Sequence, residues 1–111
     1  MNPTTRLLHR CRITLFTRNN CSLCENAKLA LSDAWDLRPF DYQEINIMNP
    51  KYKRWRDVYE FDSPVIHINL SDSDMEREYG GSLPMKLMHH IRTQDIVTKI
   101  DQLLKKDDPT N

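Results

Sequence analysis

The chain has 111 residues, which is the size of a single domain built around one hydrophobic core. Lysine plus arginine and aspartate plus glutamate number 16 each, so the overall charge favours neither nucleic acid nor an anionic membrane as a partner. No apolar run is long enough to cross a bilayer or to form the core of a secretory signal. We expect one domain over residues 1–111, flexible ends at 1–10 and 107–111, and a monomer in solution.

The three cysteines are an odd number, which does not fit a secreted disulfide framework and favours a reducing compartment. The cytoplasm is therefore the expected location. A mitochondrial location is the alternative, because Arg6, Arg10, Arg12 and Arg18 all precede Glu25, the first acidic residue. Those arginines resemble part of a mitochondrial presequence, but they overlap the first predicted strand.

The first half of the chain alternates predicted strands with a predicted helix. Arg12 to Thr17 is rich in residues that favour strands. From Ser22 to about Asp36, apolar residues recur at helical spacing, and Pro39 stops that helix. Phe40 to Ile47 alternates in part between apolar and polar residues and is predicted to form a second strand.

The middle of the chain begins with a helix-start signal at Asn49-Pro50. Tyr52, Trp55 and Tyr59 follow at helical spacing, and we expect this face to be core. Val65 to Leu70 is then a short, bulky strand.

The last part of the chain opens with Ser71 to Leu83, which is polar, contains both glycines and is predicted to be a long loop. Lys86 to Ile91 is a weaker strand. Thr93 is a suitable N-cap for a final helix. The apolar face of that helix is formed by Ile96, Val97, Ile100, Leu103 and Leu104.

A Cys-x-x-Cys sequence, Cys21-Ser22-Leu23-Cys24, stands between the first predicted strand and the first predicted helix. Its two sulfurs lie within one helical turn, close enough to bond to each other. The helix N-terminus favours a thiolate on the first cysteine, because unpaired N–H groups and the helix dipole stabilise negative charge there. Such a pair beside a βαβ pattern is a known signal of thioredoxin-like redox proteins. Taken alone, the pair also fits half of a zinc site.

The predicted element order is β-α-β-α-β-β-α, an α/β arrangement. A right-handed crossover makes the first two strands parallel, and the last two can pair as a hairpin. The order predicts a thioredoxin fold, with a four-stranded mixed sheet and three helices.

The sequence resembles the glutaredoxin-like branch of the thioredoxin superfamily. Two landmarks carry the resemblance: Cys21-Ser22-Leu23-Cys24 after the first strand, and Ser63-Pro64 before the third. It extends over about Arg12 to Lys105 and is closest to a small group with Cys-x-Leu-Cys in place of Cys-Pro-Tyr-Cys. The resemblance implies that Pro64 is cis and faces the cysteines, and that Ser63 hydrogen-bonds a bound peptide through its backbone.

We expect thiol–disulfide oxidoreductase activity in which Cys21 is the nucleophile and Cys24 resolves the mixed disulfide, giving a Cys21–Cys24 redox disulfide. Arg18, three residues before Cys21, is the candidate cation that favours the thiolate and binds substrate. The expected partner is a disulfide-containing protein or a glutathione mixed disulfide. No bound cofactor and no metal are expected, with glutathione as a candidate reductant.

The chain departs from ordinary glutaredoxins where those proteins hold glutathione. Asp62-Ser63 stands where they have Thr-Val, and Asp62 would repel a thiolate unless it turns away or pairs with Arg18. Their Gly-Gly pair after the last strand is missing. Arg92 and the free N–H groups that follow Thr93 are the candidate replacements for binding a carboxylate.

Two alternative functions remain. In one, the same cysteines bind zinc or an iron–sulfur cluster, with the other ligands from a second subunit or from glutathione. In the other, the protein is a non-catalytic adaptor with a thioredoxin fold, and the loop at 71–83 is its contact surface.

Overall fold

A computed structural model of the chain describes residues 10–70 and 84–107. The predicted loop at 71–83 and most of the two predicted flexible ends lie outside the described residues. Among the described residues, no helix is both long and apolar enough to span a membrane.

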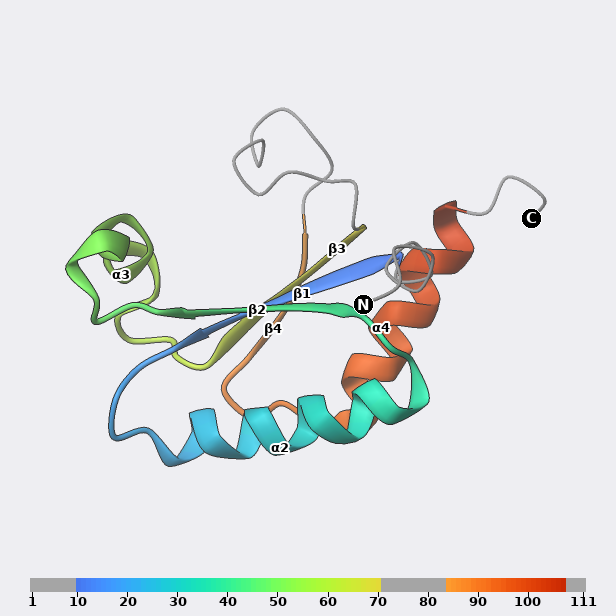
Figure 1. Cartoon of the computed structure of the whole chain (residues 1–111), viewed down its shortest axis with the longest axis horizontal. Helices are drawn as coiled ribbons and strands as arrows, with labels where there is room; N and C mark the ends of the chain where they lie inside the picture. The colour runs from blue at the N-terminus through green and yellow to red at the C-terminus, as the bar shows by residue number, and fades with distance from the viewer. Residues whose placement is uncertain (1–9, 71–83, 108–111) are drawn as a thin grey trace, which may run out of the picture.

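The elements follow one another in the predicted order (Figure 1). The strands are β1 (Cys11–Thr17), β2 (Asp41–Asn46), β3 (Val65–Leu70) and β4 (Met85–Met88). The helices are α2 (Ser22–Leu37), α3 (Lys53–Tyr59), which follows a short 3₁₀ turn at Pro50–Tyr52, and α4 (Thr93–Asp107). The side chain of Asn49 caps the 3₁₀ turn by accepting a hydrogen bond from the Lys51 N–H, which explains the helix-start signal seen there.

The four strands form one mixed sheet in the order β2-β1-β3-β4. Strand β1 is parallel to β2 and antiparallel to β3, and β3 is antiparallel to β4. Figure 1 shows α2 and α4 on one face of the sheet, whereas α3 lies at the left end of the strands. The predicted α/β fold with three helices and a four-stranded mixed sheet is therefore confirmed.

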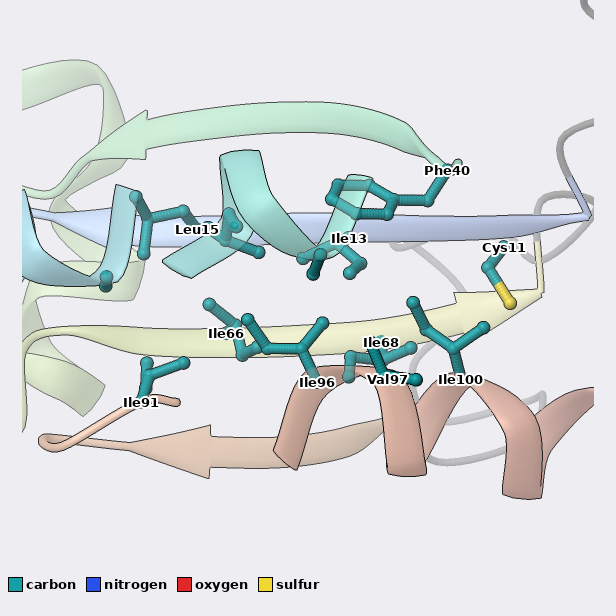
Figure 2. Close-up of a cluster of buried hydrophobic side chains, with 13 residues drawn as sticks. Cys11, Ile13, Leu15, Phe40, Ile66, Ile68, Ile91, Ile96, Val97 and Ile100 are labelled. Carbon is teal, nitrogen blue, oxygen red and sulfur yellow. The ribbon is translucent and has the colours of Figure 1, made fainter. Parts of the chain in front are cut away.

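The larger core lies between the sheet and the pair of helices α2 and α4 (Figure 2). Because side chains alternate between the two faces of a strand, Ile13 and Leu15 of β1 share this side with Ile66 and Ile68 of β3. All four are fully buried. The helices contribute residues at helical spacing, which are Ala27, Leu31, Ala34, Ile96, Val97 and Ile100.

The smaller core lies on the opposite face, under α3. Phe16 is fully buried there, with its ring centroid 4.7 Å from that of Trp55 and 5.1 Å from that of Tyr59. Tyr59 is 3% exposed, while Tyr52 and Trp55 are partly buried against the same cluster. The prediction that this helical face packs into the core is confirmed.

His67 is buried in the smaller core, within hydrogen-bonding distance of the Tyr59 hydroxyl. Burial, together with the positive charge of Lys86, lowers the pKa of His67 to about 4. The unfolded chain binds this proton more tightly, with a pKa of about 6.5. The stabilisation from a neutral His67 is therefore fully present above pH 6.5 and is lost as the pH falls toward 4.

We expect the free energy of unfolding to fall by roughly 2–3 kcal/mol through this histidine between about pH 7 and pH 4. Urea unfolding at several pH values measures it, and His67→Gln is the comparison because glutamine does not titrate. The difference between wild type and variant isolates His67 from the carboxylates that titrate in both proteins. Parallel stability curves for the two proteins across this range would contradict the assignment.

The fourth strand is shorter than predicted. Strand β4 ends at Met88 rather than at Ile91, because His89 takes a left-handed backbone conformation with φ of 63° that no strand can continue. The N–H of His89 donates a 2.9 Å hydrogen bond to the carbonyl of Pro64. Ile91 then turns into the larger core, where it is 8% exposed.

Candidate redox site

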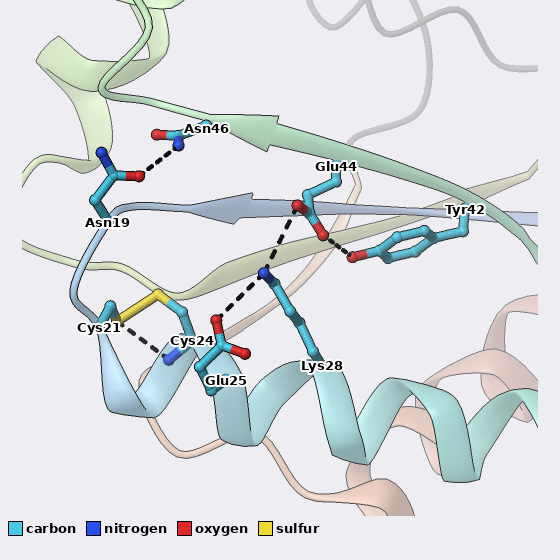
Figure 3. Close-up of polar contacts among 8 residues, drawn as sticks. All are labelled: Asn19, Cys21, Cys24, Glu25, Lys28, Tyr42, Glu44 and Asn46. Carbon is cyan, nitrogen blue, oxygen red and sulfur yellow. Dashed lines mark hydrogen bonds and ion pairs between the residues drawn. A yellow bond between two sulfur atoms is a disulfide. The ribbon is translucent and has the colours of Figure 1, made fainter.

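Cys21 occupies the N-cap position of α2. Its backbone is extended, and its sulfur accepts a 3.1 Å hydrogen bond from the N–H of Cys24 (Figure 3). The two cysteines are joined in a disulfide, with their Cα atoms 5.2 Å apart. Cys24 is fully buried, whereas Cys21 is partly exposed.

This placement gives the two sulfurs different chemistry. An N-cap atom faces N–H groups that have no partner within the helix, so a negative charge on Cys21 would be stabilised there once the disulfide is reduced. Cys24 lies inside the first turn and is shielded from solvent. A thiol of a substrate can therefore approach Cys21 more readily than Cys24.

The loop that carries Cys21 is held against the neighbouring strand. Asn20 has a positive φ of 55°, a conformation that asparagine tolerates better than most residues. The side-chain amide of Asn46, at the end of β2, donates a 2.9 Å hydrogen bond to the side-chain oxygen of Asn19 (Figure 3). The Asn19-Asn20 sequence is typical of a turn, but nothing in it indicates the contact with Asn46.

The second landmark, Ser63-Pro64, lies at the same end of the strands as the loop that carries Cys21. Phe16, near the end of β1, pairs with Val65, the first residue of β3, so the residues just before Val65 adjoin the loop after β1. The Ser63–Pro64 peptide bond is cis, and Pro64 is fully buried. The proline has the cis form that the family resemblance implied.

Arg18 joins these two loops. Its guanidinium donates a 2.8 Å hydrogen bond to the carbonyl of Glu60, at the C-terminal end of α3. A cation at that end of a helix also interacts favourably with the helix dipole. The contact places the positive charge on the loop that leads to Ser63, and it adds a positioning role to the thiolate-stabilising role predicted for Arg18.

We expect Arg18→Met to lower the free energy of unfolding by about 1–2 kcal/mol, since hydrogen bonds to charged groups contribute on this scale. Arg18→Lys separates the two roles, because lysine keeps the positive charge but lacks the several N–H donors of the planar guanidinium. If the charge matters for chemistry, the lysine variant keeps the Cys21 thiolate fraction, measured from thiolate absorbance against pH, and the methionine variant loses it. Equal thiolate fractions in all three proteins would exclude the charge role.

Asp62 turns toward His89 instead of toward Arg18. Its carboxylate oxygen lies 3.6 Å from Nε2 of His89, and both side chains are roughly half exposed. His89 is thus in contact with Asp62 through its side chain and with Pro64 through its backbone N–H. Sequence reasoning did not identify this link, because a histidine after a weak strand carries no sign of its partner.

At the proposed carboxylate-binding end of α4, Thr93 is not the N-cap that the sequence predicted. Helix α4 begins at Thr93 itself, and the Ile96 N–H donates to the carbonyl of Arg92. The Thr93 hydroxyl donates a 3.1 Å hydrogen bond to the carbonyl of Ala30 in α2, so it links two helices rather than capping its own. Arg92 is exposed.

In the described part of the chain, no three histidine, cysteine, aspartate or glutamate side chains are grouped so that they could hold one metal ion. Cys21 and Cys24 would thus need ligands from outside this part of the chain to form such a site, as the metal-binding alternative already assumed.

Comparison with solved structures identifies the fold. The fold matches thioredoxins: chloroplastic thioredoxin z (TM-score 0.66, 12% identity, 95% of this chain and 92% of the other) and thioredoxin 1 from Thermosipho africanus (TM-score 0.60, 17% identity, 86% and 97%). Thioredoxin-2 of the malaria parasite, described as a component of its protein secretion machinery, is also similar (TM-score 0.62, 9% identity, 84% and 82%).

The family follows from the sequence. Residues 12–101 match the family described as Glutaredoxin-like domain (DUF836), and the chain belongs to this family. The predicted resemblance to the glutaredoxin-like branch of the thioredoxin superfamily is therefore confirmed.

Proposed function

We propose that this protein is a thiol–disulfide oxidoreductase that reduces disulfides of proteins or of glutathione adducts. The observation that carries the proposal is the Cys21–Cys24 pair, at bonding distance on the N-terminus of α2, with one sulfur partly exposed and the other buried. The thioredoxin-like fold supports it, and so does the Ser63–Pro64 loop at the same end of the strands as the two cysteines.

In the reaction, the Cys21 thiolate attacks one sulfur of the substrate disulfide, and the other substrate sulfur leaves as a thiolate that takes up a proton. The Cys24 thiol then loses its proton and attacks the sulfur of Cys21 in the mixed disulfide. This releases the reduced substrate and leaves the Cys21–Cys24 disulfide. Two thiol equivalents, from glutathione or from a dithiol protein, restore the reduced pair and are themselves oxidised.

The first test is intact mass of the protein, native and denatured, after equilibration in glutathione buffers of graded potential. Loss of two hydrogens within the range of catalytic dithiols, roughly −270 to −120 mV, is the expected result. A glutathione adduct would in addition favour a glutaredoxin-type route. Retained metal with both thiols resistant to oxidation would overturn the proposal in favour of the metal site. If the Cys21–Cys24 pair neither forms a disulfide nor binds metal, the non-catalytic adaptor is the function that remains.

A further inference from the structure

Strand β4 ends beside the start of β3, where Met88 pairs with Val65. The next residue, His89, has a left-handed backbone with φ of 63°, a conformation that is less favourable for a residue with a Cβ than for glycine. Its N–H donates a 2.9 Å hydrogen bond to the carbonyl of Pro64. Glycine or asparagine would supply the same turn and the same N–H, so the turn alone does not account for a histidine at this position.

The side chain of His89 makes a second contact with the same loop. Its Nε2 lies 3.6 Å from a carboxylate oxygen of Asp62, and the two side chains are 49% and 44% exposed. This contact is an ion pair when the imidazole is protonated. Asp62 and Pro64 are the two sequence neighbours of Ser63, so His89 contacts the chain on both sides of Ser63.

The other end of this loop is anchored independently of the histidine. The Asp62 N–H donates a 3.1 Å hydrogen bond to the carbonyl of Tyr59, and the Ser63 hydroxyl donates to the same carbonyl at 3.4 Å. The guanidinium of Arg18 donates to the carbonyl of Glu60. Loss of the imidazole should therefore leave the loop attached to α3 and loosen only its attachment to the turn after β4.

Stability does not explain why the pair is there. An ion pair between half-exposed side chains contributes little to the free energy of unfolding, and the left-handed backbone at His89 opposes folding. Residues other than glycine that are held in such conformations cluster at functional sites. The loop that His89 contacts lies at the same end of the strands as the loop that carries Cys21.

We propose that His89 and Asp62 are positioning residues, which keep the backbone of Ser63 in place to pair with the backbone of a substrate peptide. This role rests on the proposed function and names its substrate class, which is disulfides carried on a polypeptide segment. A backbone that is already fixed loses less conformational freedom when it binds, so the peptide binds more tightly. The pair acts on peptide binding and not on the exchange between sulfurs.

The test compares reduced wild type with His89→Asn in single turnovers, followed by intact mass as closure of the Cys21–Cys24 disulfide. Asparagine tolerates the left-handed backbone and keeps its N–H, but it cannot form the ion pair. One oxidant is a short peptide closed by a disulfide, and each turnover reduces it to two thiols. The other is bis(2-hydroxyethyl) disulfide, which has no peptide backbone.

The expected result is selective for the peptide. In His89→Asn, the half-saturating peptide concentration should rise about three- to tenfold, while the limiting rate changes by less than about twofold. The rate with the small disulfide should also change by less than about twofold, because this oxidant has no backbone for Ser63 to bind. A merely structural role would affect both oxidants alike.

Three further proteins locate the effect. Asp62→Asn removes the contact from the other side and leaves no unpaired carboxylate, so it should raise the half-saturating peptide concentration to a similar extent. The double variant should resemble either single variant, because both changes break one contact. His90→Asn is the matched control and should match wild type, since it makes the same chemical change at an exposed histidine one position along the chain.

Four results would overturn this role while the proposed function stands. They are an unchanged half-saturating concentration in His89→Asn, equal losses with both oxidants, additive losses in the double variant, and the same loss in His90→Asn. A wild-type protein that is oxidised by neither disulfide would instead contradict the proposed function, and the positioning role with it.

Discussion

Replacement of Cys21 by serine is expected to abolish disulfide reduction, with a loss of activity on the order of a thousandfold or more, because an alcohol at this position cannot supply a thiolate. Reduction of a protein disulfide, followed as the release of free thiols, measures the effect. Cys24→Ser should also block turnover, but it should leave a mixed disulfide on Cys21 that is visible by intact mass.

Cys11 provides the control for these variants. Among the described residues it is the cysteine outside the Cys21–Cys24 disulfide, and it is buried at the start of β1. Cys11→Ala should therefore leave the exchange reaction close to wild type. Full activity in the Cys21→Ser protein, or loss of activity in the Cys11→Ala protein alone, would contradict the assignment of the nucleophile.

Replacement of Phe16 by alanine is expected to lower the free energy of unfolding by about 3–5 kcal/mol, the usual cost of deleting a buried aromatic ring. The ring is enclosed by Trp55, Tyr59 and His67, with centroid distances of 4.7, 5.1 and 4.7 Å. Domains of this size have a total stability of about 5–15 kcal/mol, so the loss is a large part of it.

Urea unfolding measures this loss, and Phe61→Ala is the matched control. Phe61 is 89% exposed, so the same chemical change there should alter stability by no more than about 0.5 kcal/mol. The two phenylalanines thus test burial alone. A loss below about 1 kcal/mol for Phe16→Ala would show that the smaller core contributes little to stability.

The sequence was sufficient for the fold because its main signals are local. The spacing of Cys21 and Cys24, the helical repeat that follows them and the bulky run at 65–70 each involve neighbours along the chain. These patterns decide which face of an element is buried, and the rule for crossover connections decides how the elements join. Pro64 was identified through the family resemblance, which rests on its place before a strand together with the two cysteines.

Contacts between distant parts of the chain were not predictable. Arg18 binds a backbone carbonyl 42 positions away, and a carbonyl leaves no trace in the sequence, because every residue has one. Thr93 has the right side chain for an N-cap, but the approach of α2 offers its hydroxyl the carbonyl of Ala30 instead. The end of β4 was misplaced because apolar Ile91 continues the pattern of the strand although the backbone turns at His89.

The order of strands in the sheet has a consequence for the protein during its synthesis. Strand β1 is central, and its partner β3 and the covering helix α4 are made long after the two cysteines. At about 5–20 residues per second, Ile100 leaves the ribosome several seconds after Cys24. Both thiols are therefore exposed on the nascent chain before the core that buries Cys24 can form. During this interval, oxidants and metal ions can reach both thiols, because the core that shields Cys24 has not yet formed.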